Sequence, residues 1–265
     1  MSEQARPSLA ARVAKVAGLG VVIVLALVTI LTALRTELPR SPGVMSDALG
    51  PDAGEPVAAY LQRAAATLDA GGPAGGGGGG RDHNRGDDDN TVHPDLPTGP
   101  QSPRWALISA DQAWTVANAE TVARDLPRVS AVVVQTPVDG VAMPVTEVVM
   151  VEPVAGDENR EQVLGRALER AEAEFGVAAE AGSDRGSQAA ALTADRIAAD
   201  EPAIIGLLVR AATGQLRAVA ELPGVRAVDA LPDDAVWGQF AVRPLLPQQT
   251  RAADPLPDHT PVPAR

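Results

Sequence analysis

The sequence has no cysteine and only three histidines, and aromatic residues make up 2% of its 265 positions. The lack of cysteine excludes disulfide bonds, thiolate metal sites and cysteine nucleophiles, and it leaves the redox compartment open. His83, His93 and His259 all fall in stretches rich in Pro, Gly or Asp, where no fold is expected to hold them against a nucleophile. The nucleophile-elbow, phosphate-loop and zinc-protease motifs are also missing. Together these absences exclude most hydrolase mechanisms.

Basic residues are few outside the N-terminus, and 21 of the 22 are arginine. Residues 1–40 contain five of the 22 basic and two of the 34 acidic residues, so the remaining chain has a formal charge of −15. An acidic body of this kind repels phosphate backbones and anionic lipid. We therefore expect no nucleic-acid partner.

One long apolar run is present. Residues 16–34 pass without a charge between Lys15 and Arg35, and 19 helical residues span roughly the 30 Å of a bilayer core. The alternatives are a cleaved signal peptide and a buried soluble helix, but the run exceeds a usual signal core and no small-x-small cleavage site follows. The pattern predicts a transmembrane helix at 16–34 with a cytoplasmic stub at 1–15. The short basic stub favours a plasma-membrane location with the C-terminal part extracytoplasmic.

Residues 35–103 are rich in Pro, Gly and Asp, and they include six consecutive glycines. Such a composition predicts a flexible tether, interrupted by one short helix at about 57–69. His83 and His93 lie among aspartates here, so a metal site is one hypothesis for this segment. The order of a calcium loop is absent and no scaffold arranges the ligands, so we expect a solvated acidic linker, with no metal and no cofactor. An Arg-Gly-Asp tripeptide at 85–87 is a chance match in an Asp-rich run.

Two segments of the remaining chain echo each other: "DLPRVSAVVV" at 125–134 and "ELPGVRAVDA" at 221–230. In the first unit a strand begins at Trp105, Asp111 is the expected N-cap of a helix that Pro127 ends, and strands follow at about 129–136 and 145–152. In the second unit a strand begins at Ala203, Thr213 caps a short helix, and a strand runs through about Leu231. Each echo therefore marks a helix that ends in acid-Leu-Pro and continues into a Val-rich strand.

Two such strand-helix-strand units predict an α+β domain at 104–246 with the ferredoxin-like arrangement, βαββαβ. The middle carries a helical insertion, with one helix from Asp157 to a stop at Gly176 and another at about 187–200. The segment "VWGQFAVRPLLP" is expected to add an edge strand. The proline-rich residues 247–265 predict a disordered tail.

The ending "LRAVAELPGVRAVDALP" at 216–232 resembles the last helix and strand of ferredoxin-like modules such as subtilisin-type propeptides. It is equally similar to part of the polypeptide-transport-associated domains of cell-division membrane proteins. The whole layout resembles single-pass envelope proteins of actinobacteria. These resemblances imply a fold and a location, and they carry no catalytic residue across.

Few chemistry-bearing side chains remain. Two carboxylate sets are candidates for acid–base work: Glu147 with Glu152, and Asp229 with Asp233 and Asp234. Charge on solvated strands and turns explains them equally well. The tryptophans at 105, 114 and 237 either line a ligand pocket or fill the core.

Three functional classes therefore stay open. The first is a membrane-anchored, non-enzymatic interaction module of the cell envelope with a protein partner. The others are a small-ligand sensor and a carboxylate-dependent enzyme. The sequence favours the interaction module because it needs no reactive residue, and we assign no catalytic, cofactor or metal residues.

Overall fold

The computed structural model describes residues 47–69, 102–154 and 160–264, and these belong to one compact unit. The unit is α+β and contains a five-stranded antiparallel sheet. The predicted transmembrane helix at 16–34, and His83 and His93, lie outside the described residues. Among the residues that are described, no helix combines the length and apolar character needed to cross a bilayer.

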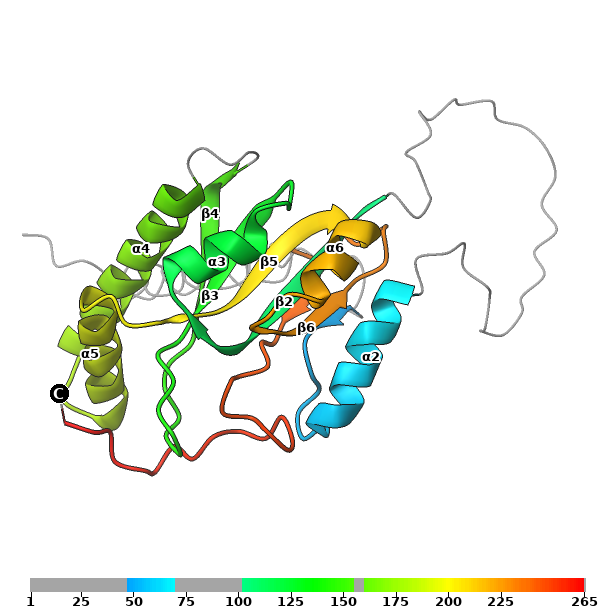
Figure 1. Ribbon diagram of the computed structural model, residues 1–265. Helices are drawn as coiled ribbons and strands as arrows, with labels where there is room; N and C mark the ends of the chain where they lie inside the picture. Colours follow the sequence, from blue (N-terminus) through cyan, green and yellow to red (C-terminus); the bar gives the residue numbers. More distant parts are fainter. Residues whose placement is uncertain (1–46, 70–101, 155–159, 265) are drawn as a thin grey trace, which may run out of the picture. The chain divides into compact units, whose positions relative to one another are not determined.

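The strands of the sheet interleave the two predicted units (Figure 1). They lie in the order β4-β3-β5-β2-β6, and each strand is antiparallel to its neighbours. Because β2 and β3 both pair with β5, they are parallel to each other; for the same reason β5 and β6, which both pair with β2, are parallel. The bounds are β2 Pro103–Trp114, β3 Val129–Val134, β4 Thr146–Val154, β5 Ile204–Ala212 and β6 Val225–Ala230.

Each pair of parallel strands is joined by a short helix. α3 (Val116–Ala123) connects β2 to β3, and α6 (Thr213–Ala220) connects β5 to β6. The echoed segments occupy the same place in both units, since each begins just after the helix and runs into the strand. In the second unit, Gly224 adopts φ of 85° and makes the turn between Pro223 and β6.

Helices cover one face of the sheet. The main core packs alternate strand residues against α3, α6 and the inserted α4 (Arg160–Glu180), and α5 (Arg185–Ala198) packs against α4. Strand side chains on the opposite face are also buried, so β3 is buried at all six positions. That opposite face therefore has a cover of its own.

Segments predicted to be disordered form much of this second cover. Leu49 packs with Trp105, Leu107 and Phe240, and β1 (Ala48–Leu49) pairs with β7 (Ala241–Val242). Helix α2 (Val57–Asp69) begins and ends where predicted, yet it packs on β6. The prediction of a flexible tether is therefore wrong for residues 47–69, because α2 buries an apolar stripe against the domain; its members are Val57, Tyr60, Ala64 and Leu68.

The prediction of a disordered tail at 247–265 is wrong, because the tail contacts the unit as far as Thr260, whose carbonyl accepts from Arg185, and Val262, which packs on a buried cluster. The Val57 N–H donates to the Arg251 carbonyl, and the Ala253 N–H donates to the Glu55 carbonyl. Ala253 is buried. The tail is held because it supplies backbone partners to the segment that leads into α2.

Three local predictions also need correction. Asp111 does not cap α3: its N–H donates to the Gly224 carbonyl as part of β2, and the Thr115 hydroxyl is the cap. Gly176 does not end α4, which continues to Glu180. Thr213 is the first residue of α6, and Ala212 occupies the N-cap position. For Asp111, backbone pairing within the sheet outweighs the local capping signal.

Candidate functional site

An aromatic cluster lies on the sheet face opposite α3, α4 and α6. Trp105 projects from β2, and the ring of Trp237 lies 4.7 Å away, centroid to centroid, at an interplanar angle of 39°. Phe240 completes the cluster, 6.0 Å from Trp105 and edge-on to Trp237. Trp237 is 37% exposed, whereas Trp105 and Phe240 are buried. The cluster thus has a buried base and one accessible aromatic face.

The third tryptophan lies elsewhere. Trp114 is buried in the main core, and its indole Nε1–H donates to the Gly224 carbonyl at 3.2 Å. The structure therefore brings together two of the three tryptophans, and it places Trp105 and Trp114 in buried clusters, as the core-filling alternative predicts.

Two arginines share the ring of Trp105. Arg210, on β5, pairs directly with Trp105 in the strand register, and Arg128 lies just before β3. The guanidinium carbon of each lies 5.5 Å from the Trp105 ring centroid. Cation–π contacts of this kind contribute about 0.5–1 kcal/mol at exposed sites and more when water is excluded. We call these five residues the Trp–Arg site: Trp105, Arg128, Arg210, Trp237 and Phe240.

The hydrogen-bonding capacity of these arginines is largely unused. The Arg128 Nε–H donates to the Ser130 hydroxyl at 3.0 Å. The Arg210 Nε is buried and has no hydrogen-bond partner within the described part of the chain. In the same part of the chain neither guanidinium has a carboxylate within 4.0 Å.

A second polar cluster surrounds Asp229, which is 2% exposed on β6. Its carboxylate accepts a hydrogen bond from the Gly50 N–H at 2.8 Å, and Arg63 Nη1 lies 3.9 Å away. Gly50 has φ of 100°, and a Cβ there would overlap the carbonyl oxygen of Arg243. Asp229 therefore fastens the segment before α2 to the sheet.

Burial also shifts the pKa values of two side chains in this cluster. Burial raises the pKa of Asp229, although the Gly50 N–H and the Arg63 charge oppose that increase. Burial, assisted by the Asp229 charge, raises the pKa of the Tyr60 phenol. The Ser109 hydroxyl is close enough to lower the pKa of Tyr60, yet neither hydroxyl finds a well-aligned hydrogen bond among the described residues.

Of the two candidate carboxylate sets, the structure describes the side chains of only one completely, and its members differ in burial. Asp229 is buried, whereas Asp233 and Asp234 are exposed in the segment after β6. Glu147 is exposed on β4, and the side chain of Glu152 lies outside the described residues. His259 is exposed beside Asp258. Throughout the described ranges, no three His, Asp or Glu side chains gather as metal ligands.

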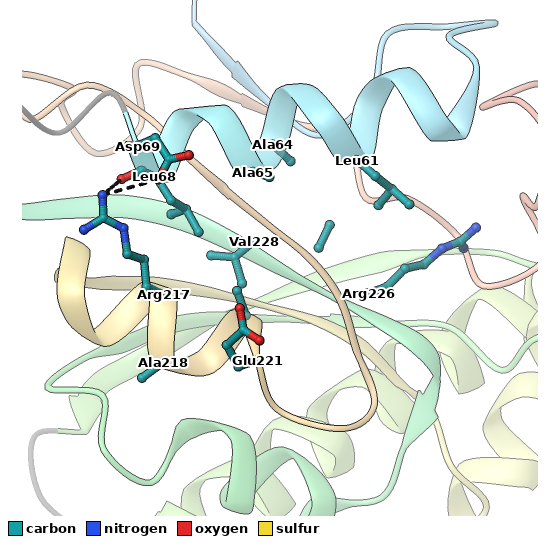
Figure 2. A pocket seen from close by; sticks show the side chains of 12 residues that line it. Leu61, Ala64, Ala65, Leu68, Asp69, Arg217, Ala218, Glu221, Arg226 and Val228 are labelled. Atoms are coloured by element: carbon teal, nitrogen blue, oxygen red, sulfur yellow. Dashed lines mark hydrogen bonds and ion pairs between the residues drawn. The ribbon is translucent and has the colours of Figure 1, made fainter.

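A groove of about 550 Å³ lies between α2 and α6 above β6 (Figure 2). Its lining is mixed: Leu61 and Leu68 from α2, Ala218 from α6 and Val228 from β6 are apolar, whereas Asp69, Arg217, Glu221 and Arg226 are charged. At one end Arg217 pairs with Asp69 at 3.5 Å. The groove therefore has the dimensions of a small-ligand pocket.

No family model matches the chain, and no curated protein or solved structure matches it. The sequence alone does not reveal the Trp–Arg site because its members come from four separate segments. One signal was present: Arg210 is the only charged residue in the apolar run of β5, where a charge is costly unless it has a specific contact.

Proposed function

We propose that this chain is a membrane-anchored, non-enzymatic interaction module of the cell envelope, with residues 16–34 in the bilayer and the described unit on the extracytoplasmic side. The partner is a protein of the envelope. This assignment agrees with the resemblance to single-pass envelope proteins of actinobacteria and with an acidic body that disfavours nucleic acid.

We further infer that the unit is a ferredoxin-like sandwich. The strand order β3-β5-β2-β6 interleaves the β2–α3–β3 and β5–α6–β6 units, as a duplicated split βαβ fold does. Strand β4 and helices α4 and α5 then form the insertion between the two units. Such a fold supports many functions, so the assignment of function depends on the surface.

The observation that carries the proposal is the Trp–Arg site. Tryptophan and arginine are the residues most enriched at the energetic centres of protein interfaces. Trp237 presents a large, partly exposed ring on a rigid base, and Val236 next to it is 53% exposed. Binding there would bury apolar area that is already ordered, so little conformational entropy would be lost.

The test is site-specific photocrosslinking of the full-length chain in its native membrane. A photoreactive phenylalanine at position 237 should give a discrete adduct with an envelope protein. The control is position 177 on α4, where Val177 is 72% exposed and should give none. Protease added to intact cells should cleave the unit. Equal adducts at both positions, no adduct at 237, or protection from protease would each overturn the proposal.

The groove between α2 and α6 favours a second candidate, a small-ligand sensor. The same experiment separates the two when the photoreactive residue replaces Ala218, which lines the groove. A low-mass adduct at 218, without a protein adduct at 237, would select the sensor.

A further inference from the structure

The two arginines of the Trp–Arg site converge on one point from different strands. In the sheet order β3-β5-β2, Arg128 lies two strands away from Trp105, a lateral distance of about 10 Å. Its guanidinium nevertheless comes as close to the ring as that of Arg210, at 5.5 Å. The Arg210 N–H also donates to the Arg128 carbonyl, so the two backbones are adjacent. The Arg128 side chain therefore extends across β5 toward the guanidinium of Arg210.

This convergence is unusual in so acidic a chain, whose formal charge is −12. Several other arginines of the described unit, such as Arg104, Arg185 and Arg226, donate to backbone carbonyls. Four more have carboxylate partners: Arg63 pairs with Glu55, Arg196 with Glu201, Arg217 with Asp69, and Arg243 with Asp52. Arg128 and Arg210 lack such a partner among the described residues, although acidic residues are abundant. Two like charges near one ring repel each other unless an anion lies between or beside them.

We propose that Arg128 and Arg210 bind an oxyanion, a carboxylate or a phosphate, carried on a ring that packs against Trp237. The guanidinium fork donates two parallel hydrogen bonds to either group, which a lysine cannot do. The unused donors of both arginines supply these bonds, and the accessible face of Trp237 contacts the ring. This inference rests on the proposed function and specifies the chemistry of what the Trp–Arg site recognises.

The acidic residues around the site limit the number of negative charges that a ligand can carry. Asp233 and Asp234 are exposed in the same segment as Trp237, four and three positions before it. A polyanion would be repelled by these carboxylates and by the acidic body, whereas a single oxyanion would contact the arginines alone. We therefore expect the site to prefer a ligand with a single anionic group over a polyanion.

The experiment is a ligand-observed NMR titration of the full-length chain in neutral-lipid nanodiscs with three probes. Phenyl phosphate and benzoate carry the two oxyanions on the same ring, and benzyl alcohol is the neutral control. At least one anion should bind saturably, and at least tenfold more tightly than the alcohol. The preferred anion identifies the group as a phosphate or a carboxylate.

Variants then assign the binding to the two arginines. Arg128→Gln and Arg210→Gln should each lower the affinity for the preferred anion at least tenfold. Arg210→Lys should lower this affinity by a smaller factor. The matched control is Arg166→Gln, since Arg166 is exposed on α4 and should leave binding unchanged. If Arg210→Gln unfolds, Arg128→Gln and Trp237→Ala still test the site.

The inference is overturned if neither anion binds saturably, if the alcohol binds equally, or if Arg128→Gln and Arg210→Lys both bind as the parent does. These outcomes need no partner protein, so they are separate from the crosslinking result. An adduct at 237 without anion binding would contradict only the oxyanion inference. Anion binding without an adduct would contradict only the proposal of a protein partner.

Discussion

Replacing Tyr60 with phenylalanine should stabilise the unit, although Tyr60 is completely buried. Its phenol oxygen has no hydrogen-bond partner among the described residues. A buried polar group without a partner costs about 1–3 kcal/mol relative to its hydrated state. Phenylalanine removes that cost and keeps the ring that packs on Ala227 and Leu245.

The expected gain in the free energy of unfolding is about 1 kcal/mol, the lower end of that cost. For a unit of this size the gain corresponds to an increase in Tm of about 2–4 °C. The contact of Arg63 with the Tyr60 ring, at 5.2 Å from guanidinium carbon to centroid, persists in the variant. Thermal and urea unfolding of the full-length chain, followed by near-ultraviolet circular dichroism, measures the change.

Ser109→Ala is the matched variant, because the Ser109 hydroxyl is also buried without a partner in the described residues. Ser109→Ala should leave the free energy of unfolding unchanged or increase it. In the double variant, the changes of the two single variants should add. A loss of 1 kcal/mol or more in Tyr60→Phe, or a coupling above about 0.5 kcal/mol in the cycle, would refute the reasoning. Either result would mean that the two hydroxyls bond to each other or to Asp229.

Two further predictions concern the same corner of the unit. Burial raises the folded-state pKa of Asp229 above its ordinary value, so its stabilising contribution is complete below the unfolded pKa and is lost as the pH rises through the folded pKa. Unfolding titrations from pH 4 to pH 7 should therefore show wild type losing stability relative to Asp229→Asn as the pH rises, and a constant difference would contradict this sign. Gly50→Ala should destabilise by more than the roughly 1–2 kcal/mol of left-handed strain, because its Cβ would overlap the Arg243 carbonyl. Urea midpoints test this, with Gly140→Ala as control, since Gly140 has a positive φ but open space for a Cβ.

Local patterns were sufficient for the elements of both strand-helix-strand units. The Val-rich run after Pro127 is β3, and the predicted helix at 57–69 is α2 with the same bounds. The N-cap of α3 was misplaced at Asp111 because a capping residue looks the same inside a strand. Backbone pairing extends β2 past Asp111 to Trp114. The Asp111 N–H donates to the Gly224 carbonyl, and the Ala203 N–H donates to the Trp114 carbonyl.

The Trp–Arg site could not be predicted because it depends on strand order. Arg128 and Arg210 are 82 positions apart in the sequence, and they meet at Trp105 only when β5 lies between β3 and β2. The same holds for Asp229, which is one carboxylate among many until Gly50 and Tyr60 cover it. Composition identifies candidates of this kind, and topology selects among them.

The packing of α2 changes what the proposed anchor implies. If residues 35–103 formed one free tether, the unit would range far from the bilayer. Because α2 packs on β6, the glycine-rich residues 70–101 join two elements of the same unit and add nothing to its reach. Only residues 35–46 separate the proposed membrane helix from the described unit, and covalent geometry limits twelve residues to about 40 Å. If residues 16–34 lie in the bilayer as proposed, a partner that binds the Trp–Arg site is therefore expected near the membrane surface, where the local concentration of other membrane-anchored proteins is high.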